Sequence, residues 1–188
     1  MVRLIDTNAL SFVPWKNGGG FTRNVAAFPE AAGFDDFIWR VSIADVAESG
    51  PFSRFPGVDR SIALLDGAGM TLAGEGDVFS LTMYFEPHDF AGEDPIRATL
   101  LDGPTRDFNL MLRRRLVQGR LTAHHGDMRI STAADHALFY CARGEYQMED
   151  GTRVKAGWAA QLTRLTPGEL FSSLTPDSVL LAALIEIQ

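Results

Sequence analysis

Residues 37–45 read FIWRVSIAD, and their side chains alternate between large apolar groups and a mixed set that includes Arg40 and Ser42. Successive side chains of a β-strand point to opposite faces, so this pattern predicts a strand with one apolar face and one mixed face. If the mixed face lines a barrel interior, Arg40 needs an anionic partner, because an unpaired buried charge is costly. Either an internal carboxylate or the carboxylate of a ligand would meet that need.

Similar short runs occur along the whole chain, separated by glycine, proline, aspartate and asparagine. The predicted strands are 37–45, 61–65, 70–73, 78–85, 96–101, 108–113, 128–131, 137–142, 146–148, 158–162 and 178–187. The pattern contains no long amphipathic helix, so we expect an all-β fold. Strands this closely spaced favour a sandwich or a closed barrel, because closure removes unpaired edge strands.

A faint internal repeat suggests two related halves. Residues 64–72 and 139–147 each place a pair of apolar residues before a glycine, and the two glycines, Gly69 and Gly144, lie 75 positions apart. Each copy is typical of a β-hairpin. Two similar barrels in tandem would explain the likeness, and so would two unrelated hairpins.

The composition is that of an ordinary globular protein. With 188 residues, of which 46% are hydrophobic, the chain can form one large domain or two small ones that pack closely. Its formal net charge of -7 argues against nucleic acids and anionic membranes as partners, because both attract basic surfaces. The single cysteine, Cys141, lies in an apolar run and is expected to be a buried, unreactive thiol. A lone cysteine and the lack of an export signal favour the cytoplasm.

Residues 14–23 read PWKNGGGFTR and combine an aromatic ring, a cation, an amide and three consecutive glycines. Glycine permits a positive φ and leaves room where a side chain would clash, so the backbone here is predicted to approach a ligand. A tight turn between two strands is the alternative. The spacing of a phosphate-binding loop, with a Lys-Ser or Lys-Thr pair after the glycines, is missing.

A second dense loop covers residues 50–60 and reads GPFSRFPGVDR. Its two prolines make it stiff, and it carries two aromatic rings and an Asp-Arg pair that leads into a strand. Stiffness serves either the pre-organisation of a binding site or the stability of the loop itself.

Together these motifs resemble those of the HutD/Ves family of bacterial proteins. The resemblance rests on PWKNGGG at 14–20, WRVSIA at 39–44, GPFS at 50–53, FPGVDR at 55–60 and DFNLM at 107–111. It implies a double-barrel cupin fold, that is, a bicupin of jelly-roll type, in one compact unit. The approximate halves are 1–105 and 106–188, and a strand exchanged between them is compatible with this fold. The resemblance also implies a connection to histidine utilisation, through binding of a pathway intermediate that moderates expression of the catabolic genes.

Cupins often hold a metal, but the histidines of this chain are not spaced for one. The usual set needs two histidines one residue apart, a carboxylate and a later histidine, all facing one interior. His124 and His125 are adjacent and would point to opposite faces of a strand, while His88 and His136 lie in unrelated segments. We therefore expect neither a metal nor another cofactor, and the sequence also lacks the motifs of a serine or cysteine nucleophile.

The leading hypothesis is a metal-free binding protein, not an enzyme, for a small anion with a planar polar part, such as urocanate or formylglutamate. Lysine offers a point charge, arginine a bidentate fork for a carboxylate, asparagine both donor and acceptor, and an aromatic ring a stacking surface. The candidate ligand-binding residues are Trp15, Lys16, Asn17, Gly18, Gly19, Arg23, Arg40, Ser42, Phe52, Phe55, Asp59, Arg60 and Asn109.

Two alternatives belong to other classes. A metal-free isomerase or epimerase would need a titratable pair, such as Lys16 with Asp59 or Asp107, beside the pocket. A structural or interaction module would instead fill the pocket with its own side chains. A homodimer is the default assembly in either case.

Overall fold

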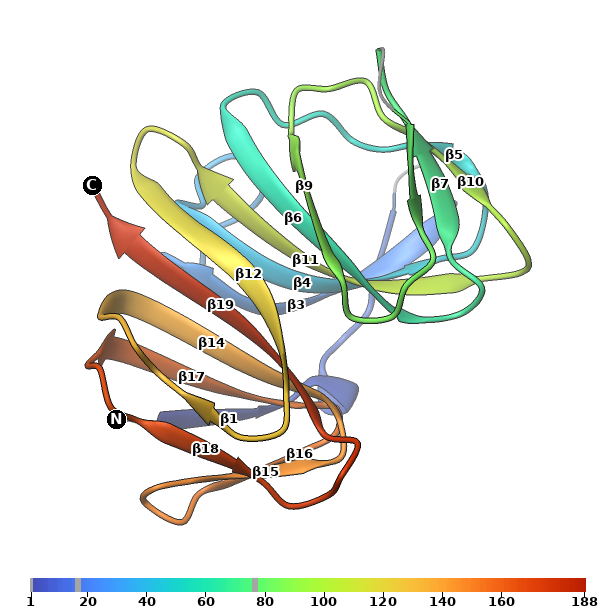
Figure 1. The fold of residues 1–188 in the computed structure, drawn as a ribbon. Helices are drawn as coiled ribbons and strands as arrows, with labels where there is room; N and C mark the ends of the chain where they lie inside the picture. The colour runs from blue at the N-terminus through green and yellow to red at the C-terminus, as the bar shows by residue number, and fades with distance from the viewer. Residues whose placement is uncertain (1, 16–17, 76–77) are drawn as a thin grey trace. The chain divides into compact units, whose positions relative to one another are not determined.

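The chain forms two compact units in the computed structural model, which describes residues 2–15, 18–75 and 78–188 (Figure 1). The first unit is Ser11–Val117, and the second consists of Met1–Leu10 together with Gln118–Gln188. The division falls after Val117 and not between 105 and 106, because strand β11 (Thr105–Arg113) lies inside a sheet of the first unit.

The first unit consists of a six-stranded and a four-stranded sheet with antiparallel strand pairs. The large sheet has the order β2 (Val13–Pro14), β3 (Gly20–Phe28), β4 (Trp39–Val46), β11, β6 (Val58–Asp66) and β9 (Pro87–Ala91). The small sheet has the order β5 (Gly50–Pro51), β10 (Arg97–Leu100), β7 (Met70–Ala73) and β8 (Val78–Leu81). Strands β3, β4, β11 and β6 are therefore the inner strands of the large sheet, and each is paired on both sides.

The second unit has a five-stranded and a four-stranded sheet. The order of the first is β1 (Val2–Asp6), β17 (Trp158–Leu165), β14 (Ala134–Arg143), β19 (Val179–Ile187) and β12 (Val117–His125). The order of the second is β13 (Met128–Arg129), β18 (Leu170–Ser173), β15 (Glu145–Met148) and β16 (Arg153–Lys155). The N-terminal strand β1 thus belongs with C-terminal strands and pairs antiparallel with β17, where Val2 lies opposite Leu162.

The all-β prediction is confirmed. Over the described residues the chain has strands, one short 3-10 helix (η1, Thr7–Ala9) and no α-helix, and none of the four sheets closes on itself. Within the same residues, no helix is long and apolar enough to cross a membrane. The alternating stretch at 37–45 corresponds to β4, whose central residues are buried on both faces.

The two copies of the internal repeat are not hairpins, and that prediction was wrong. Gly69 lies between β6 and β7, which belong to different sheets of the first unit, and Gly144 lies between β14 and β15, which do the same in the second unit. Both glycines have a positive φ. A turn that carries the chain from one sheet to the other needs the same glycine as a hairpin turn, so the two are alike in sequence.

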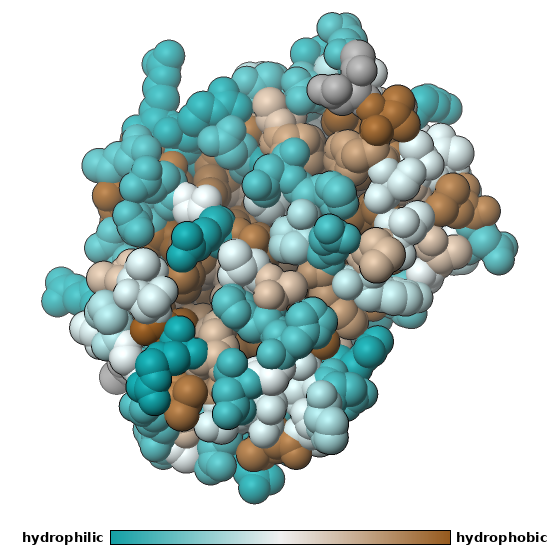
Figure 2. Space-filling model, viewed as in Figure 1, coloured by the Kyte–Doolittle hydropathy of each residue, from teal (hydrophilic) through white to brown (hydrophobic). Residues whose placement is uncertain are grey.

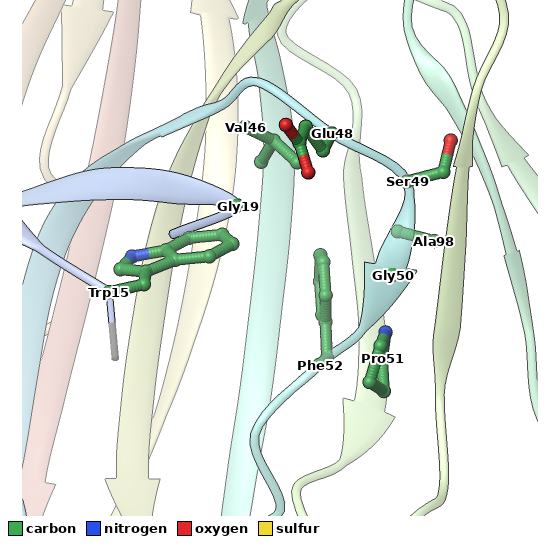
Figure 3. A pocket seen from close by; sticks show the side chains of 9 residues that line it. All are labelled: Trp15, Gly19, Val46, Glu48, Ser49, Gly50, Pro51, Phe52 and Ala98. Atoms are coloured by element: carbon green, nitrogen blue, oxygen red, sulfur yellow. The ribbon is translucent and has the colours of Figure 1, made fainter. Parts of the chain in front are cut away.

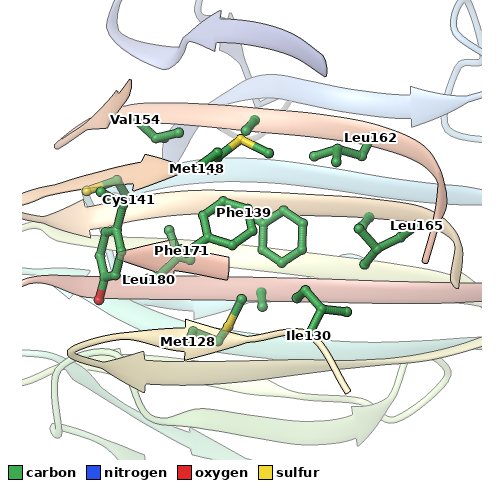
Figure 4. Close-up of a cluster of buried hydrophobic side chains, with 14 of the residues drawn as sticks. Met128, Ile130, Phe139, Cys141, Met148, Val154, Leu162, Leu165, Phe171 and Leu180 are labelled. Atoms are coloured by element: carbon green, nitrogen blue, oxygen red, sulfur yellow. The ribbon is translucent and has the colours of Figure 1, made fainter. Parts of the chain in front are cut away.

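Side chains fill the interior of the second unit. Phe139 and Phe171 are fully buried with ring centroids 4.4 Å apart, and methionine and aliphatic side chains surround them (Figure 4). The buried Tyr146 hydroxyl donates a hydrogen bond to the carbonyl of Ser178, so this core leaves that polar group satisfied.

The first unit has an apolar core formed by strands of both its sheets. Fully buried members include Ile62, Leu64, Met70, Leu72 and Leu81. On the molecular face in Figure 2, polar side chains predominate and apolar ones are exposed singly or in small groups, as is normal for a globular protein.

Candidate functional site

The first unit contains a cavity of about 700 Å³, which is within the usual size range of small-molecule sites. Six residues predicted to bind a ligand line it: Trp15, Ser42, Phe52, Phe55, Arg60 and Asn109. They come from segments that are far apart in the sequence. The large sheet and the loop after β5 bring them together.

The floor of the cavity is one face of the large sheet. Asp107, Asn109 and Met111 alternate along β11 and point to this face, and Asn109 lies opposite Ser42 of the neighbouring strand β4. On the other side of β11, Arg60 of β6 lies opposite Met111. Polar side chains from three adjacent inner strands therefore converge on one space.

Arg60 is the cation of the cavity. It is 7% exposed, and its guanidinium carbon lies 4.8 Å from the ring centroid of Phe90, 5.5 Å from that of Phe52 and 5.7 Å from that of Phe55. Its Nε finds no hydrogen-bond partner among the described residues. Burial lowers the pKa of Arg60 to about 10 although Asp107 opposes the shift, so the side chain still carries its charge at neutral pH.

Two of these rings are held by backbone hydrogen bonds of the loop after β5. The Phe52 amide donates to the Ile96 carbonyl at 2.9 Å, and the Phe55 amide donates to the Gly92 carbonyl at 2.7 Å. A Cβ on Gly92 would lie 2.7 Å from the Phe55 carbonyl oxygen and 2.8 Å from that of Val58. The loop therefore depends on a glycine at 92 to approach this closely.

Asp107 is a carboxyl group at the bottom of the same cavity, and it was not among the predicted binding residues. It is 1% exposed, and neither of its oxygens has a hydrogen-bond partner within the described parts of the chain. Burial raises its pKa to about 7; the charge of Arg60 opposes this shift and that of Asp45 adds to it. No ion pair within 4.0 Å connects Asp107 and Arg60 in the described structure, although both side chains line the cavity.

Asn109 extends this row of unsatisfied acceptors. Its side chain is 5% exposed. Like the Asp107 oxygens, its Oδ1 accepts no hydrogen bond from any residue that the structure describes. Buried polar atoms without partners destabilise a protein, so positions of this kind suit donors that a bound molecule supplies. The cavity thus offers one cation at Arg60 and acceptors at Asn109 and Asp107.

The tryptophan of the glycine-rich stretch is held as a wall of the cavity. Trp15 Nε1 donates a hydrogen bond to Thr22 Oγ1 at 2.7 Å, and the Trp15 amide donates to the Gly20 carbonyl at 2.9 Å. A Cβ on Gly20 would lie 2.5 Å from the Asp45 carbonyl oxygen and 3.2 Å from the indole ring. Gly20 therefore serves close packing under Trp15.

A smaller hollow of about 120 Å³ adjoins this wall. Figure 3 shows the Trp15 and Phe52 rings next to each other in its lining, with Gly19 near the indole. Gly18 lines neither space and has a φ of +75°, as a turn requires. The predicted residues Lys16 and Asn17 lie outside the described residues, so their part in binding stays a prediction.

Two other predicted residues, Arg23 and Asp59, are not in the cavity lining. Arg23 points to the opposite face of the sheet, because its neighbour Thr22 lines the cavity; its Nη2 lies 3.1 Å from Asp45 Oδ2. Asp59 is exposed and accepts a hydrogen bond from Arg114 Nε at 2.7 Å. Both are occupied by partners within the protein.

Arg40 lies two residues before Ser42 on β4, so its side chain points to the same face of the sheet. It does not line the cavity itself. Its guanidinium carbon is 4.1 Å from the centroid of the Phe34 ring, and that ring does line the cavity. Burial lowers the pKa of Arg40. Within the described residues it forms no ion pair with a carboxylate, so an aromatic ring takes the place of the internal anion that we considered.

Metal-ligating side chains and the single thiol were considered among the sequence candidates, and the described structure gives the surroundings of both. No cluster of three or more histidine, cysteine, aspartate or glutamate side chains there could hold a metal ion. Cys141 is fully buried, and burial raises the pKa of its thiol to about 12, so it is protonated at neutral pH.

The HutD family model matches residues 7–181 of the chain. The chain is 38% identical to a Pseudomonas putida protein described as an uncharacterized 21.2 kDa protein in the hutC 3' region. This match extends over 136 residues and covers 72% of this chain and 71% of the relative. Over 184 residues, 93% of this chain and 99% of the relative, it is 37% identical to Protein Ves of Cronobacter sakazakii.

Solved structures agree with these relationships. HutD from Pseudomonas fluorescens SBW25 matches with a TM-score of 0.88 and 28% identity, covering 100% of both chains. A cupin 2 conserved barrel domain protein from Leptotrichia buccalis matches with a TM-score of 0.62 at 12% identity, covering 98% of this chain and 96% of that one. The second match shows a cupin-like fold and carries no information on function.

Proposed function

Because the chain belongs to the HutD family, which also includes Ves, we propose that it is a receptor for a small carboxylate from histidine degradation. The observation that carries the proposal is the buried, charged Arg60 in a cavity of about 700 Å³, with no carboxylate within ion-pair distance among the described residues. A bound carboxylate would neutralise this charge and accept hydrogen bonds from its guanidinium.

The remaining polar groups indicate what else the ligand should carry. Asn109 Oδ1 and the oxygens of Asp107 lack hydrogen-bond donors. A ligand with an N–H group several ångströms from its carboxylate could donate to them while Arg60 binds the carboxylate. Urocanate and formylglutamate both combine a carboxylate with an N–H group. The rings of Trp15, Phe52 and Phe55 offer apolar walls for the rest of the molecule.

The proposal has a structural and a regulatory part as well. We take the two units as the two barrels of a bicupin, one filled by its own side chains and one hollow. Occupancy of the hollow unit would report the level of a pathway intermediate and so moderate histidine utilisation. The hutC-region name of the Pseudomonas putida relative supports this connection.

Isothermal titration of the purified protein with urocanate and with formylglutamate tests the proposal. Arg60→Gln should abolish the heat of binding, because it removes the charge, whereas Arg97→Gln, an exposed arginine on β10, should bind like the unaltered protein. Lys16→Ala tests the predicted point charge separately. Binding that Arg60→Gln leaves intact would overturn the role of Arg60.

A second measurement keeps the proposal testable if Arg60→Gln fails to fold. The neutral amide of urocanate has the same shape but no carboxylate, and it should not bind to the unaltered protein. If the amide binds as well as urocanate, the anion site is refuted. If neither carboxylate binds or raises the melting temperature, the protein is better described as an interaction module.

A further inference from the structure

Binding of a carboxylate by Arg60 does not require a second, buried carboxyl group in the cavity, yet Asp107 places one there. A carboxyl group that only stabilises the fold would be hydrogen-bonded at 1% exposure. Both oxygens of Asp107 are without partners within the described chain, and the side chain lines the cavity. This group is therefore positioned to exchange a hydrogen with whatever occupies the space.

The sheet register places the groups in an order along the cavity. Arg60 is level with Met111, Asn109 lies two residues further along β11, and Asp107 two residues beyond that. Four residues of a strand span about 13 Å between Cα atoms. The charges of Arg60 and Asp107 nevertheless act on each other. A small molecule can thus be held at one end by Arg60 while its other end contacts Asp107.

We propose that the cavity catalyses proton transfer on small 2-oxo acids, with Asp107 as the base that interconverts their keto and enol forms. The proposal rests on the proposed function in one respect, because Arg60 must hold the carboxylate. The guanidinium fork would contact one carboxylate oxygen and the adjacent keto oxygen. Asp107 would then lie toward the carbon next to the keto group.

The reaction balances without an oxidant, a reductant or a second reactant. The Asp107 carboxylate removes a proton from the carbon adjacent to the keto carbon, and the C–H electron pair becomes the new C=C bond. The π electrons of the carbonyl move to its oxygen, where the charge of Arg60 stabilises the enolate. The protonated Asp107 then returns its proton to that oxygen, which yields the enol, or to the carbon, which restores the ketone.

The environment of Asp107 suits this task. A general base is most effective when its pKa lies near the working pH, and burial raises the pKa of Asp107 to about 7. Arg60 on β6 and Asp45 on β4 are the charged groups that act on it. Three aromatic rings around Arg60 exclude water from the guanidinium and so strengthen its effect on a developing negative charge.

Phenylpyruvate is a suitable probe, because its enol absorbs in the ultraviolet and its C3 hydrogens exchange with deuterium on enolisation. The purified protein should accelerate the loss of the enol signal and the C3 exchange in D2O seen by NMR. Asp107→Asn keeps the shape but cannot accept the proton, so both rates should fall about 100-fold or more. Asp102→Asn, which changes an exposed aspartate outside the cavity lining, is the matched control and should leave both rates unchanged.

The outcomes separate the two proposals. If the unaltered protein binds carboxylates but accelerates neither reaction, or if Asp107→Asn retains the rate, the catalytic proposal is overturned and the receptor stands. If no carboxylate binds, both fall. Should Asp107→Asn fail to fold, trimethylpyruvate, which has no C3 hydrogen, must competitively inhibit the exchange of phenylpyruvate by the unaltered protein; lack of inhibition overturns catalysis in this cavity.

Discussion

Asp107→Asn should change how the stability of the ligand-free protein depends on pH. Burial raises the pKa of Asp107 from 3.8 to about 7 in the folded protein. Between these two values the folded state holds a proton that the unfolded chain has released, so the free energy of unfolding falls as the pH rises through this window. Asparagine does not ionise, so the variant escapes this loss.

The size of the effect follows from the shift. Between pH 5 and the folded pKa of about 7, roughly two pKa units are crossed, and each is worth about 1.36 kcal/mol. The unaltered protein should therefore lose about 3 kcal/mol between pH 5 and pH 8 that Asp107→Asn retains.

Urea unfolding of both proteins at pH 5, 6, 7 and 8 measures this difference directly. Asp102→Asn, which removes one negative charge from an exposed turn, is the matched control for the change in net charge. If the stabilities of Asp107→Asn and of the unaltered protein change in parallel from pH 5 to pH 8, Asp107 is not an isolated buried acid and the reasoning about the cavity fails.

Three further predictions concern other parts of the fold. Gly92→Ala should destabilise the first unit by about 1–3 kcal/mol in urea unfolding and weaken urocanate binding, because the new Cβ would press on the carbonyls of Phe55 and Val58; full stability and affinity would show that the loop is not pinned there. Phe139→Ala should cost about 3–5 kcal/mol in the same assay, and a loss below 1 kcal/mol would contradict the filled core. Cys141 should resist iodoacetamide at pH 8 until the protein is unfolded, so modification of the native protein would refute its burial.

Much of the fold class follows from local patterns, because alternation along a strand is a property of neighbouring residues. The same alternation predicts that Ser42 faces away from the apolar core, and Ser42 does line the cavity. The strand β12, with histidines, an arginine and a glycine, lacks this alternation and was not predicted. Pairing of β1 with β17 depends on contacts between the two ends of the chain, for which a local pattern carries no signal.

The candidate site was predicted in part, and the misses have physical causes. Arg23 was included for its charge, although its neighbour Thr22 lines the cavity and alternation then sends Arg23 to the other face. Asp107 was considered only as half of a catalytic pair, yet it lies two residues from Asn109 and so shares its face. The alternation of side chains between the two faces of a strand could have identified Asp107 and excluded Arg23.

The pairing of β1 with β17 also bears on how the chain is made. A ribosome delivers β1 first and its partner strand only near the end of synthesis, whereas Ser11–Val117 is a continuous segment that emerges in full before the second unit exists. Domains generally fold as units during translation. We therefore expect the first unit, which contains the cavity, to fold on the nascent chain before β1 can pair with residues 158–165.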